Sequence, residues 1–492
     1  MQPTTVLIII IGYFALLLGI SHITSRRATN ITFFLGNRQS PWYIVAFGMI
    51  SATLSGVTFI SVPGYVMNSQ FSYMQIVIGY LLGYAVIANV LMPMYYRLNL
   101  TSIYTYLEKR FGKSSYKAGA SFFLLSRTIG AAFRLFLVAN VLQITLFNQW
   151  NIPFEATVVI TILLIWLYTF RGGIRTIIWT DSLQTLFMLT AVGVTVYLIS
   201  QQLDLSFGGL VETVAESKYS RVFFWENWNG EYHFIKQFFA GAFIAIVMTG
   251  LDQDMMQKNL SCRNIKEAKK NMYWFSIALV PVNLLFMSLG ALLIIYAKKE
   301  GIPLPDQSDD LFPIIATQGY LAPVVGIFFL IGLVAAAYSS ADSALTALTT
   351  SFTMDILDSK GMEEKPLKRR RKKVHVGVSL VLAVIILIFN AVNNQAVISA
   401  LFTIAGYTYG PLLGMYTFGL FTKYQVRDKW VPVVAVLSPI ISGLISFNSK
   451  TLFNGYEFGF ELLILNGLIT LIGLFLLRKK DGAKSLASEA ED

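Results

Sequence analysis

Long uninterrupted blocks of hydrophobic residues constrain the fold of this chain more than any other feature. Each block is roughly 18 to 30 residues long, and about 20 apolar residues in a helix cross a bilayer core of about 30 Å. Hydrophobic residues make up 55% of the chain and charged residues 13%, which is more apolar surface than a water-soluble fold can bury. A transmembrane β-barrel would instead show alternating segments of about 10 residues. We therefore predict an all-α integral membrane protein with about 13 transmembrane helices, at residues 4–25, 41–66, 72–97, 118–148, 155–170, 177–200, 235–257, 271–297, 322–356, 374–393, 396–421, 429–447 and 456–477.

Positive charge is distributed unequally between the segments that join these helices. With the N-terminus outside the cell, 30 of the 38 Lys and Arg residues fall in segments predicted to be cytoplasmic and six in external ones. Cytoplasmic loops of membrane proteins are enriched in Lys and Arg. The sequence therefore predicts a multi-pass protein of the inner (plasma) membrane, with the N-terminus outside and the tail 478–492 in the cytoplasm. The basic run Lys368–Lys373 is interpreted as an anchor beside anionic lipid rather than a nucleic-acid site.

Residues typical of enzymes and metal centres are few. The single cysteine, Cys262, cannot form an internal disulfide, and three histidines leave little for a transition-metal site. The sequence contains no recognisable metal-ligand spacing, nucleophile motif or phosphate-binding loop. We predict that the protein is not an enzyme and that its helices do not require an oligomer.

Two predicted spans contain segments that disfavour a continuous helix in lipid. One is 51–56 (Ser-Ala-Thr-Leu-Ser-Gly) in the second span, and the other is 248–254 (Met-Thr-Gly-Leu-Asp-Gln-Asp) in the seventh. Small and polar residues also let helices pack closely, which is the alternative interpretation of each segment taken alone. Breaks at corresponding positions five spans apart indicate an inverted-repeat transporter, whose substrate and ions bind where unwound backbone lines a cavity.

Several separate stretches of the sequence carry a resemblance to a known family. They are 52–55 with Thr58 and Phe59, 172–174 followed by 179–181 and Gln184, Asp252 and Gln253 with Gln257, and 335–337 followed by 339–343. In this order the stretches resemble the sodium:solute symporter family, which includes the sodium/glucose, sodium/proline and sodium/sialic acid transporters. The resemblance spans residues 5–475.

The resemblance implies a fold like that of the leucine transporter, with two inverted repeats of five helices at 41–200 and 235–421. A leading helix at 4–25 and two trailing helices within 429–477 complete a single transmembrane domain over 1–492. The resemblance also implies a symporter that works by alternating access and couples the uptake of a small organic solute to sodium.

Hydroxyl and carboxylate groups gather in the ninth predicted span. A hard cation such as sodium needs several oxygen ligands in place of its water, and Ser339, Asp342 and Ser343 share one helix face. Serines bonded to the preceding turn of their own helix are the alternative interpretation. Similarity to the family implies a principal sodium site made of the backbone carbonyls of Ser51, Leu54 and Ala336 and the hydroxyls of Ser339 and Ser340.

A second sodium site, present in some relatives, corresponds here to Asp181, Ser339, Asp342 and Ser343. Ionisable residues within a membrane span are costly and indicate function. Two carboxylates close together repel each other unless a cation or a shared proton lies between them. Asp342 replaces the Ser or Thr of some two-sodium members, so coupling to a proton is an open alternative, as is the pairing of one aspartate with an arginine.

Arg127 and Arg134 are seven residues apart and lie on one face of one predicted span. The planar guanidinium group fits a carboxylate. In the sialic acid transporters an arginine on the equivalent helix binds the carboxylate of the substrate, although neither Arg127 nor Arg134 aligns directly with it. A structural pairing with aspartate, or a position at the membrane interface, is the alternative for at least one of them.

Further substrate contacts are predicted on the helices that face the same cavity. Asp252 falls where the sugar transporter has an asparagine that binds substrate, and an Asp and an Arg in one cavity suit an acidic sugar, a zwitterion or a polyol. We predict a carbohydrate as the solute, with an acidic sugar such as sialic acid favoured by the two arginines. The alternative is a sodium- or proton-coupled transporter of an amino acid or a monocarboxylate. The candidate residues besides the arginines are Thr53, Ser55, Thr58, Gln75, Tyr80, Asp252 and Gln253.

Overall fold

The computed structural model describes residues 3–24, 41–98, 103–169, 174–357, 359, 362–393 and 395–479. This described part is helical almost throughout, which confirms the prediction of an all-α protein. The continuous long helices are α1 (Pro3–Thr24), α8 (Lys113–Leu142), α9 (Phe154–Thr169), α10 (Ile174–Gln202), α14 (Ile265–Lys299), α16 (Pro323–Ser351), α17 (Glu364–Val392), α20 (Val431–Phe447) and α22 (Leu462–Leu476).

Other helices occur as consecutive pieces that follow one another along the chain, or as short connecting turns. The consecutive pieces are α3 (Trp42–Thr53), η3 (Val57–Ser61) and α4 (Val62–Ser69); α5 (Tyr73–Val86), η5 (Ile87–Leu91) and α6 (Met92–Arg97); α12 (Phe234–Ala245), η8 (Ile246–Gly250) and α13 (Gln253–Leu260); and α18 (Val397–Thr408) and α19 (Gly410–Phe421). The short helices include α7 (Thr105–Arg110), α11 (Phe207–Glu216), η9 (Ser308–Asp310), α15 (Leu311–Thr317) and α21 (Ser449–Leu452).

The helices have the length and the surface of a membrane protein. Among the described residues, six helices are long and apolar enough to cross a membrane, the bent pair α18 and α19 is a seventh candidate, and shorter apolar helices accompany them. Large apolar side chains are exposed, including Leu186 at 60%, Leu380 at 63% and Phe447 at 91%. Such surfaces suit lipid rather than water. A multi-pass membrane protein is therefore confirmed, whereas the count of thirteen spans stays a prediction.

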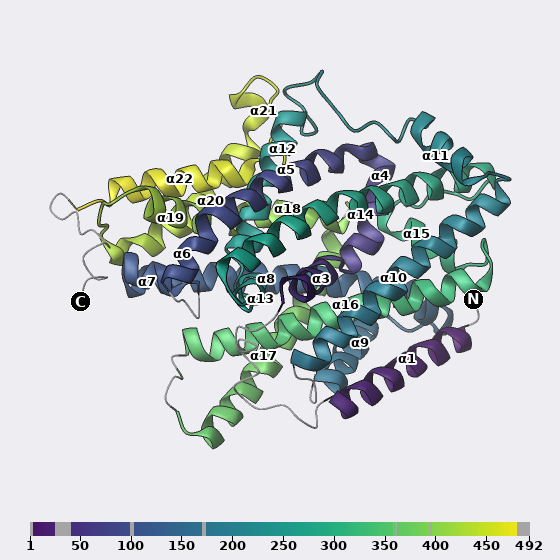
Figure 1. Cartoon of the computed structure of the whole chain (residues 1–492), viewed down its shortest axis with the longest axis horizontal. Coiled ribbons are helices and arrows are strands. Elements are labelled where there is room, and N and C mark those ends of the chain that lie inside the picture. Colours follow the sequence, from purple (N-terminus) through teal and green to yellow (C-terminus); the bar gives the residue numbers. More distant parts are fainter. Residues whose placement is uncertain are drawn as a thin grey trace.

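Both predicted helix breaks are present. α3 ends at Thr53, and Leu54 leaves the helical conformation with φ −72° and ψ 74° before η3 begins. The second break follows η8 at Leu251, and Asp252 is extended with φ −101° and ψ 123° before α13 begins. Because α13 packs against α3 (Figure 1), the non-helical backbone of the two breaks is brought into the same region of the molecule.

Glycines let α5 and α12 approach closely beside the second break. A Cβ atom added to Gly79 would lie 2.0 Å from the carbonyl oxygen of Phe238, and one added to Gly241 would lie 2.2 Å from that of Ile76. Gly79 and Gly83 are four residues apart and share a face, which is the spacing of small residues that packs membrane helices. This contact joins a helix from the first half of the chain to one from the second.

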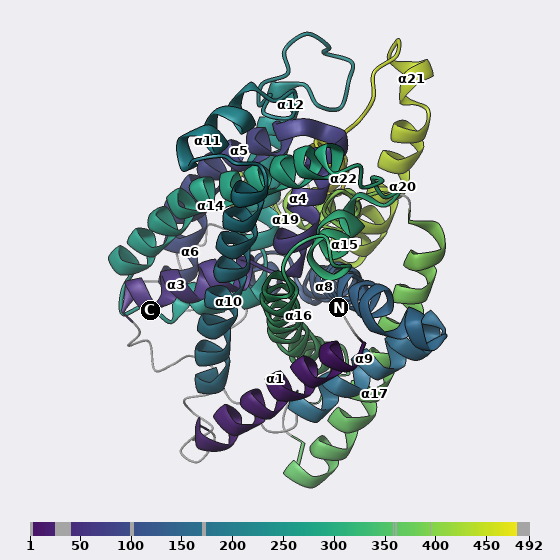
Figure 2. The same cartoon turned by 90° about the vertical axis from the view of Figure 1, so that its right-hand side faces the viewer.

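The helix α16 lies near the centre of the molecule and is seen almost end-on in Figure 2. It packs against α10, α8, α17 and α1, and α10 in turn packs against α3. The three helices that carry the predicted sodium ligands, α3, α10 and α16, therefore form a connected group.

Several segments differ from the predicted boundaries. α17 begins at Glu364 rather than 374, so the basic run Lys368–Lys373 is helical, because Lys and Arg favour helix. The segment 201–234, which joins the predicted spans 177–200 and 235–257, contains the helix α11 (Phe207–Glu216). The predicted span 396–421 bends by 48° between α18 and α19, where Pro411 occupies the first turn of α19, a position that suits proline.

Candidate functional site

A cavity of about 170 Å³ is lined by residues from both helix breaks. Its wall comes from α3, η3, α5, α8, α12, η8, α13, α14 and α18, and it reaches from Ile398 in the first turn of α18 to Lys258 in α13. The structure brings eight of the predicted site residues together in this wall, and their roles in binding stay predictions. They are Thr53, Leu54, Ser55, Thr58, Tyr80, Arg127, Arg134 and Asp252.

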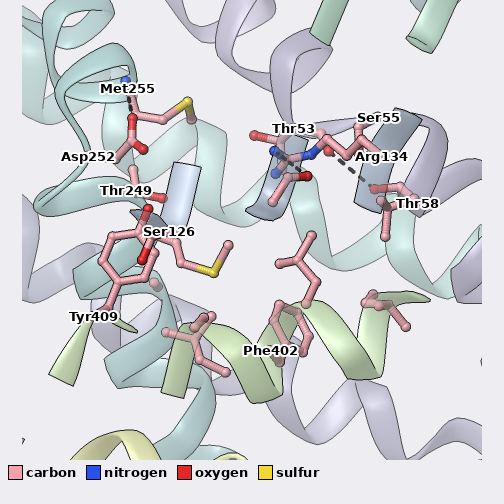
Figure 3. Close-up of a pocket in the computed structure, with 18 of the residues that line it drawn as sticks. Thr53, Ser55, Thr58, Ser126, Arg134, Thr249, Asp252, Met255, Phe402 and Tyr409 are labelled. Atoms are coloured by element: carbon pink, nitrogen blue, oxygen red, sulfur yellow. Dashed lines mark hydrogen bonds between the residues drawn. The ribbon is translucent and has the colours of Figure 1, made fainter. Parts of the chain in front are cut away.

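Asp252 and Arg127 form an ion pair in the cavity wall, with 3.5 Å between Oδ2 and Nη1. The side chain of Asp252 is 1% exposed and that of Arg127 is 14% exposed. The second carboxylate oxygen of Asp252, Oδ1, accepts a hydrogen bond from the backbone N–H of Met255 at 3.1 Å (Figure 3). It thereby caps α13, whose first amides have no partner within the helix. Asp252 thus connects the N-terminus of α13 to Arg127 of α8.

In Figure 3, Arg134 lies across the cavity from Asp252, beside Thr53, Ser55 and Thr58 at the first break. Its Nη1 donates to the carbonyl oxygen of Gly130, one turn earlier on α8, at 3.5 Å. The hydroxyl of Thr58 donates across the break to the carbonyl oxygen of Thr53 at 3.2 Å. A guanidinium group and unwound backbone therefore face the same cavity.

The charges of the described lining residues are unequal. Arg127, Arg134 and Lys258 are cationic, and Asp252 is the one carboxylate among the lining side chains that the structure describes. Charges interact strongly where water is largely excluded. The described wall therefore favours an anionic ligand.

Two predicted substrate residues lie elsewhere and hold loops. Gln75 is fully buried; its Nε2 donates to the carbonyl oxygen of Tyr232 at 3.0 Å, and its Oε1 accepts from the N–H of Phe224 at 3.2 Å. The Oε1 of Gln253 accepts from the N–H of Ile103 at 2.8 Å. Both side-chain amides therefore hydrogen-bond to backbone groups outside the cavity wall, a structural role that the sequence pattern did not indicate.

Other polar residues of the wall were missed by the sequence analysis. Ser126 is buried, and its Oγ has no hydrogen-bond partner in the part of the chain that the structure describes. Thr249 falls within the predicted break 248–254, and Asn283 is a buried polar residue in the apolar helix α14. A polar residue within a membrane span is a signal of function, so these two were identifiable. Tyr409 lines the cavity at the bend between α18 and α19.

The predicted sodium ligands are described only in part. Leu54 lies at the first break with a non-helical ψ, which turns its carbonyl out of the regular helical pattern, and Ala336 of α16 is fully buried. Unwound carbonyls of this kind suit a hard cation. The backbones of the other residues belong to α3, α10 and α16, and their side chains lie outside the described part of the structure: Ser51, Asp181, Ser339, Ser340, Asp342 and Ser343.

Comparisons with known proteins agree with this arrangement. The model of the sodium:solute symporter family matches residues 33–427. The sodium/sialic acid symporter NanT of Aliivibrio fischeri is 26% identical over 424 residues, which are 83% of this chain and 81% of that protein. The sodium/sialic acid symporter SiaT of Proteus mirabilis is 26% identical over 454 residues, which are 89% of this chain and 88% of that protein.

The fold also matches a solved structure. A sodium-coupled sialic acid symporter in a substrate-bound, outward-open state superposes with a TM-score of 0.76 at 21% identity, covering 97% of this chain and 99% of that one. This similarity shows the fold. Because the family model matches well over half of the sequence, the chain belongs to the sodium:solute symporter family and is a sodium-coupled symporter of a small solute.

Proposed function

We propose that the protein imports an acidic sugar together with sodium, with sialic acid as the leading candidate. The observation that carries the proposal is the positive excess in the described cavity wall, where Arg127, Arg134 and Lys258 outnumber Asp252. The sodium/sialic acid symporters NanT and SiaT support the same class of solute. In this proposal Arg134 binds the carboxylate of the sugar, because a guanidinium group pairs with a carboxylate through two parallel hydrogen bonds.

Neutral polar groups in the wall suit the hydroxyls of a sugar. The hydroxyl of Ser126, the hydroxyl of Thr249 and the amide of Asn283 line the cavity together with Thr53 and Thr58. A small-molecule site is typically apolar with a few placed polar groups that fix orientation. These groups supply both donors and acceptors, as a polyhydroxylated ligand needs.

The alternative solutes, an amino acid or a monocarboxylate, fit the described wall less well. A carboxylate is the strongest partner for the ammonium group of an amino acid, and Asp252 already pairs with Arg127 and caps the amide of Met255. A simple aliphatic monocarboxylate has no hydroxyl to offer Ser126, whose buried Oγ has no partner among the described residues, and an unpaired buried group costs about 1–3 kcal/mol. The carboxylate of an acidic sugar matches the positive charge of the described wall, and its hydroxyls match the hydroxyl groups of the wall.

For sodium, we propose the two sites that the family resemblance implies. The packing of α3 on α10 and of α10 on α16 supports them, because it brings the helices of both ligand sets together. Proton coupling through the two aspartates is the alternative for the second site. The principal site comprises Ser51, Leu54, Ala336, Ser339 and Ser340, and the second comprises Asp181, Ser339, Asp342 and Ser343.

We further propose thirteen spans in one transmembrane domain, with inverted repeats at 41–200 and 235–421 and the N-terminus outside the cell. The two breaks support the repeats, because one falls in each. The protein then works in the plasma membrane by alternating access, without requiring an oligomer. Sodium bound beside the first break stabilises the arrangement open to the outside, and its release inside lets the solute leave.

The test is the thermal stability of the purified protein in sodium and in potassium, with a sialic acid, a neutral hexose, an amino acid or lactate. A ligand that binds only the folded state at 100 times its dissociation constant adds about 2.7 kcal/mol of stability. We expect stabilisation by sodium, increased by the sialic acid, lost in Ser340→Ala and retained in the control Ser351→Ala on the same helix. Equal stability in sodium and in potassium would contradict the proposed sodium sites and favour the alternative of proton coupling. Stabilisation by another solute alone would contradict the acidic sugar.

A further inference from the structure

The outer end of α18 is capped by residues from distant segments. The residue before the helix, Ala396, provides no side-chain cap, and the first amides of a helix have no partner within it. Asp309 Oδ2 accepts from the N–H of Val397 at 2.7 Å, and Ser61 Oγ accepts from the N–H of Ile398 at 2.9 Å. The hydroxyl of Ser61 also donates to Asp309 Oδ1 at 2.9 Å. We call these groups the α18 clamp: Ser61, Asp309 and the amides of Val397 and Ile398.

The α18 clamp joins three parts of the chain in a dry environment. Ser61 is fully buried and Asp309 is 6% exposed. Ser61 ends η3, which continues the first broken helix beyond its break, and Asp309 lies in η9, ahead of α15. Close packing fixes the two segments, because a Cβ atom added to Gly64 would lie 2.5 Å from the carbonyl oxygen of Ser308. Buried amides that lose their acceptors are costly, so the clamp resists displacement of α18.

The next turn of α18 forms one wall of the cavity. Leu401 and Phe402 line it, and Phe402 is labelled in Figure 3. The ring of Phe402 stacks on Tyr73 with 6.1 Å between centroids. In the proposed topology this end of α18 faces the outside of the cell. Opening the cavity to the outside along this wall therefore requires the first turn of α18 to leave the clamp.

We propose that Asp309 is a positioning residue for transport, which with Ser61 holds the outer end of α18 closed over the cavity and releases it when the cavity opens outward. The inference rests on the proposed topology and on alternating access. The adjacent Asp310 provides a matched comparison, because its carboxylate accepts from Asn140 of α8 at 2.7 Å and not from α18.

The test is thiol labelling from outside the cell. A reporter cysteine replaces Leu401 in a Cys262→Ser background, and intact cells receive a membrane-impermeant thiol reagent. Asp309→Ala removes both acceptor oxygens and Ser61→Ala removes the hydroxyl, so we expect each to raise the labelling rate roughly five-fold to ten-fold, by comparison with other lost helix caps. Asp309→Asn is expected to label at the wild-type rate, since its amide oxygen accepts from Val397 and its amide N–H donates to Ser61. Asp310→Ala is the control.

Uptake separates a positioning role from a merely structural one. We expect Asp309→Ala to lower the turnover and the apparent KM together, because the outward-open state is more populated and closes more slowly, whereas a loss of folded protein would lower the maximal rate alone. Wild-type labelling in both Asp309→Ala and Ser61→Ala, or an equal rise in Asp310→Ala, would overturn the inference. So would labelling from the cytoplasmic side only. Labelling needs neither sodium nor solute, so its expected pattern in a protein without sodium-dependent uptake would count against the proposed function alone.

Discussion

The ion pair between Arg127 and Asp252 allows a quantitative test of how the cavity is held. Arg127→Met removes the cation and leaves Asp252, which is 1% exposed, with a buried negative charge that has lost this partner. Removing one member of a buried pair costs about 3–5 kcal/mol. Asp252→Asn costs less, because Arg127 is 14% exposed and the amide oxygen still accepts from Met255. In the double variant neither charge remains.

The assay compares the unfolding temperatures of the wild type, both single variants and the double variant in detergent. An unfolding entropy of about 2.1 cal/mol/K per residue gives roughly 1 °C for each kcal/mol in a chain of this length. Helices of membrane proteins persist in detergent, so the true entropy is smaller and the shift larger. We expect Arg127→Met to lose at least about 3 °C and Asp252→Asn, added to it, to recover about 1–3 kcal/mol of stability. Additive losses in the double variant would show that the pair contributes no coupling, and would refute the reasoning.

Three further predictions concern packing, recognition and pH. Gly79→Ala should lower the unfolding temperature, because overpacking destabilises the fold by about 1–3 kcal/mol. Gly193→Ala should leave the unfolding temperature unchanged or higher, because an added Cβ there meets nothing within 4 Å. Equal shifts for the two variants would refute the close contact between α5 and α12. Arg134→Gln should abolish stabilisation by a sialic acid and Arg134→Lys should weaken it, measured by thermal shift; unchanged stabilisation would remove Arg134 from the site. Burial raises the pKa of Asp309 to about 7, so its contribution to stability is full near pH 4 and is lost as the pH rises through 7. The unfolding temperature of the wild type should therefore fall more between pH 5 and 8 than that of Asp309→Asn. Burial also raises the pKa of the neighbouring Asp310, so Asp310→Asn is measured to separate its contribution from that of Asp309. An identical pH profile for the wild type and Asp309→Asn would contradict the assignment of this pH dependence to Asp309.

Much of the architecture was readable because it depends on local composition. The length and hydropathy of the blocks predicted a helical membrane protein, since each helix must match the bilayer by itself. The breaks at Leu54 and Asp252 were predicted because small and polar residues within an apolar block are local signals. The two arginines were predicted to share one face of a helix because they are seven residues apart, and both line the cavity.

Local patterns failed where a side chain serves a distant segment. Gln75 and Gln253 have the same chemistry as substrate ligands, yet each fastens backbone of a loop far away in sequence. Ser126 gave no separate signal, because only packing decides which face of a long helix meets a cavity. The bend at which Tyr409 lines the cavity was likewise absent from the predicted span.

The sequence by itself determined that the chain is a bundle of membrane helices with two interrupted spans and the motifs of a sodium symporter. Periodicity and hydropathy contain this information because they describe each helix against its solvent. The tertiary structure alone decided the partners: Asp252 with Arg127, and Asp309 and Ser61 with the amides that begin α18. Those contacts join residues more than 80 positions apart, and their geometry exists only once the helices have packed, because a buried charge or amide takes whichever partner the packing brings within reach.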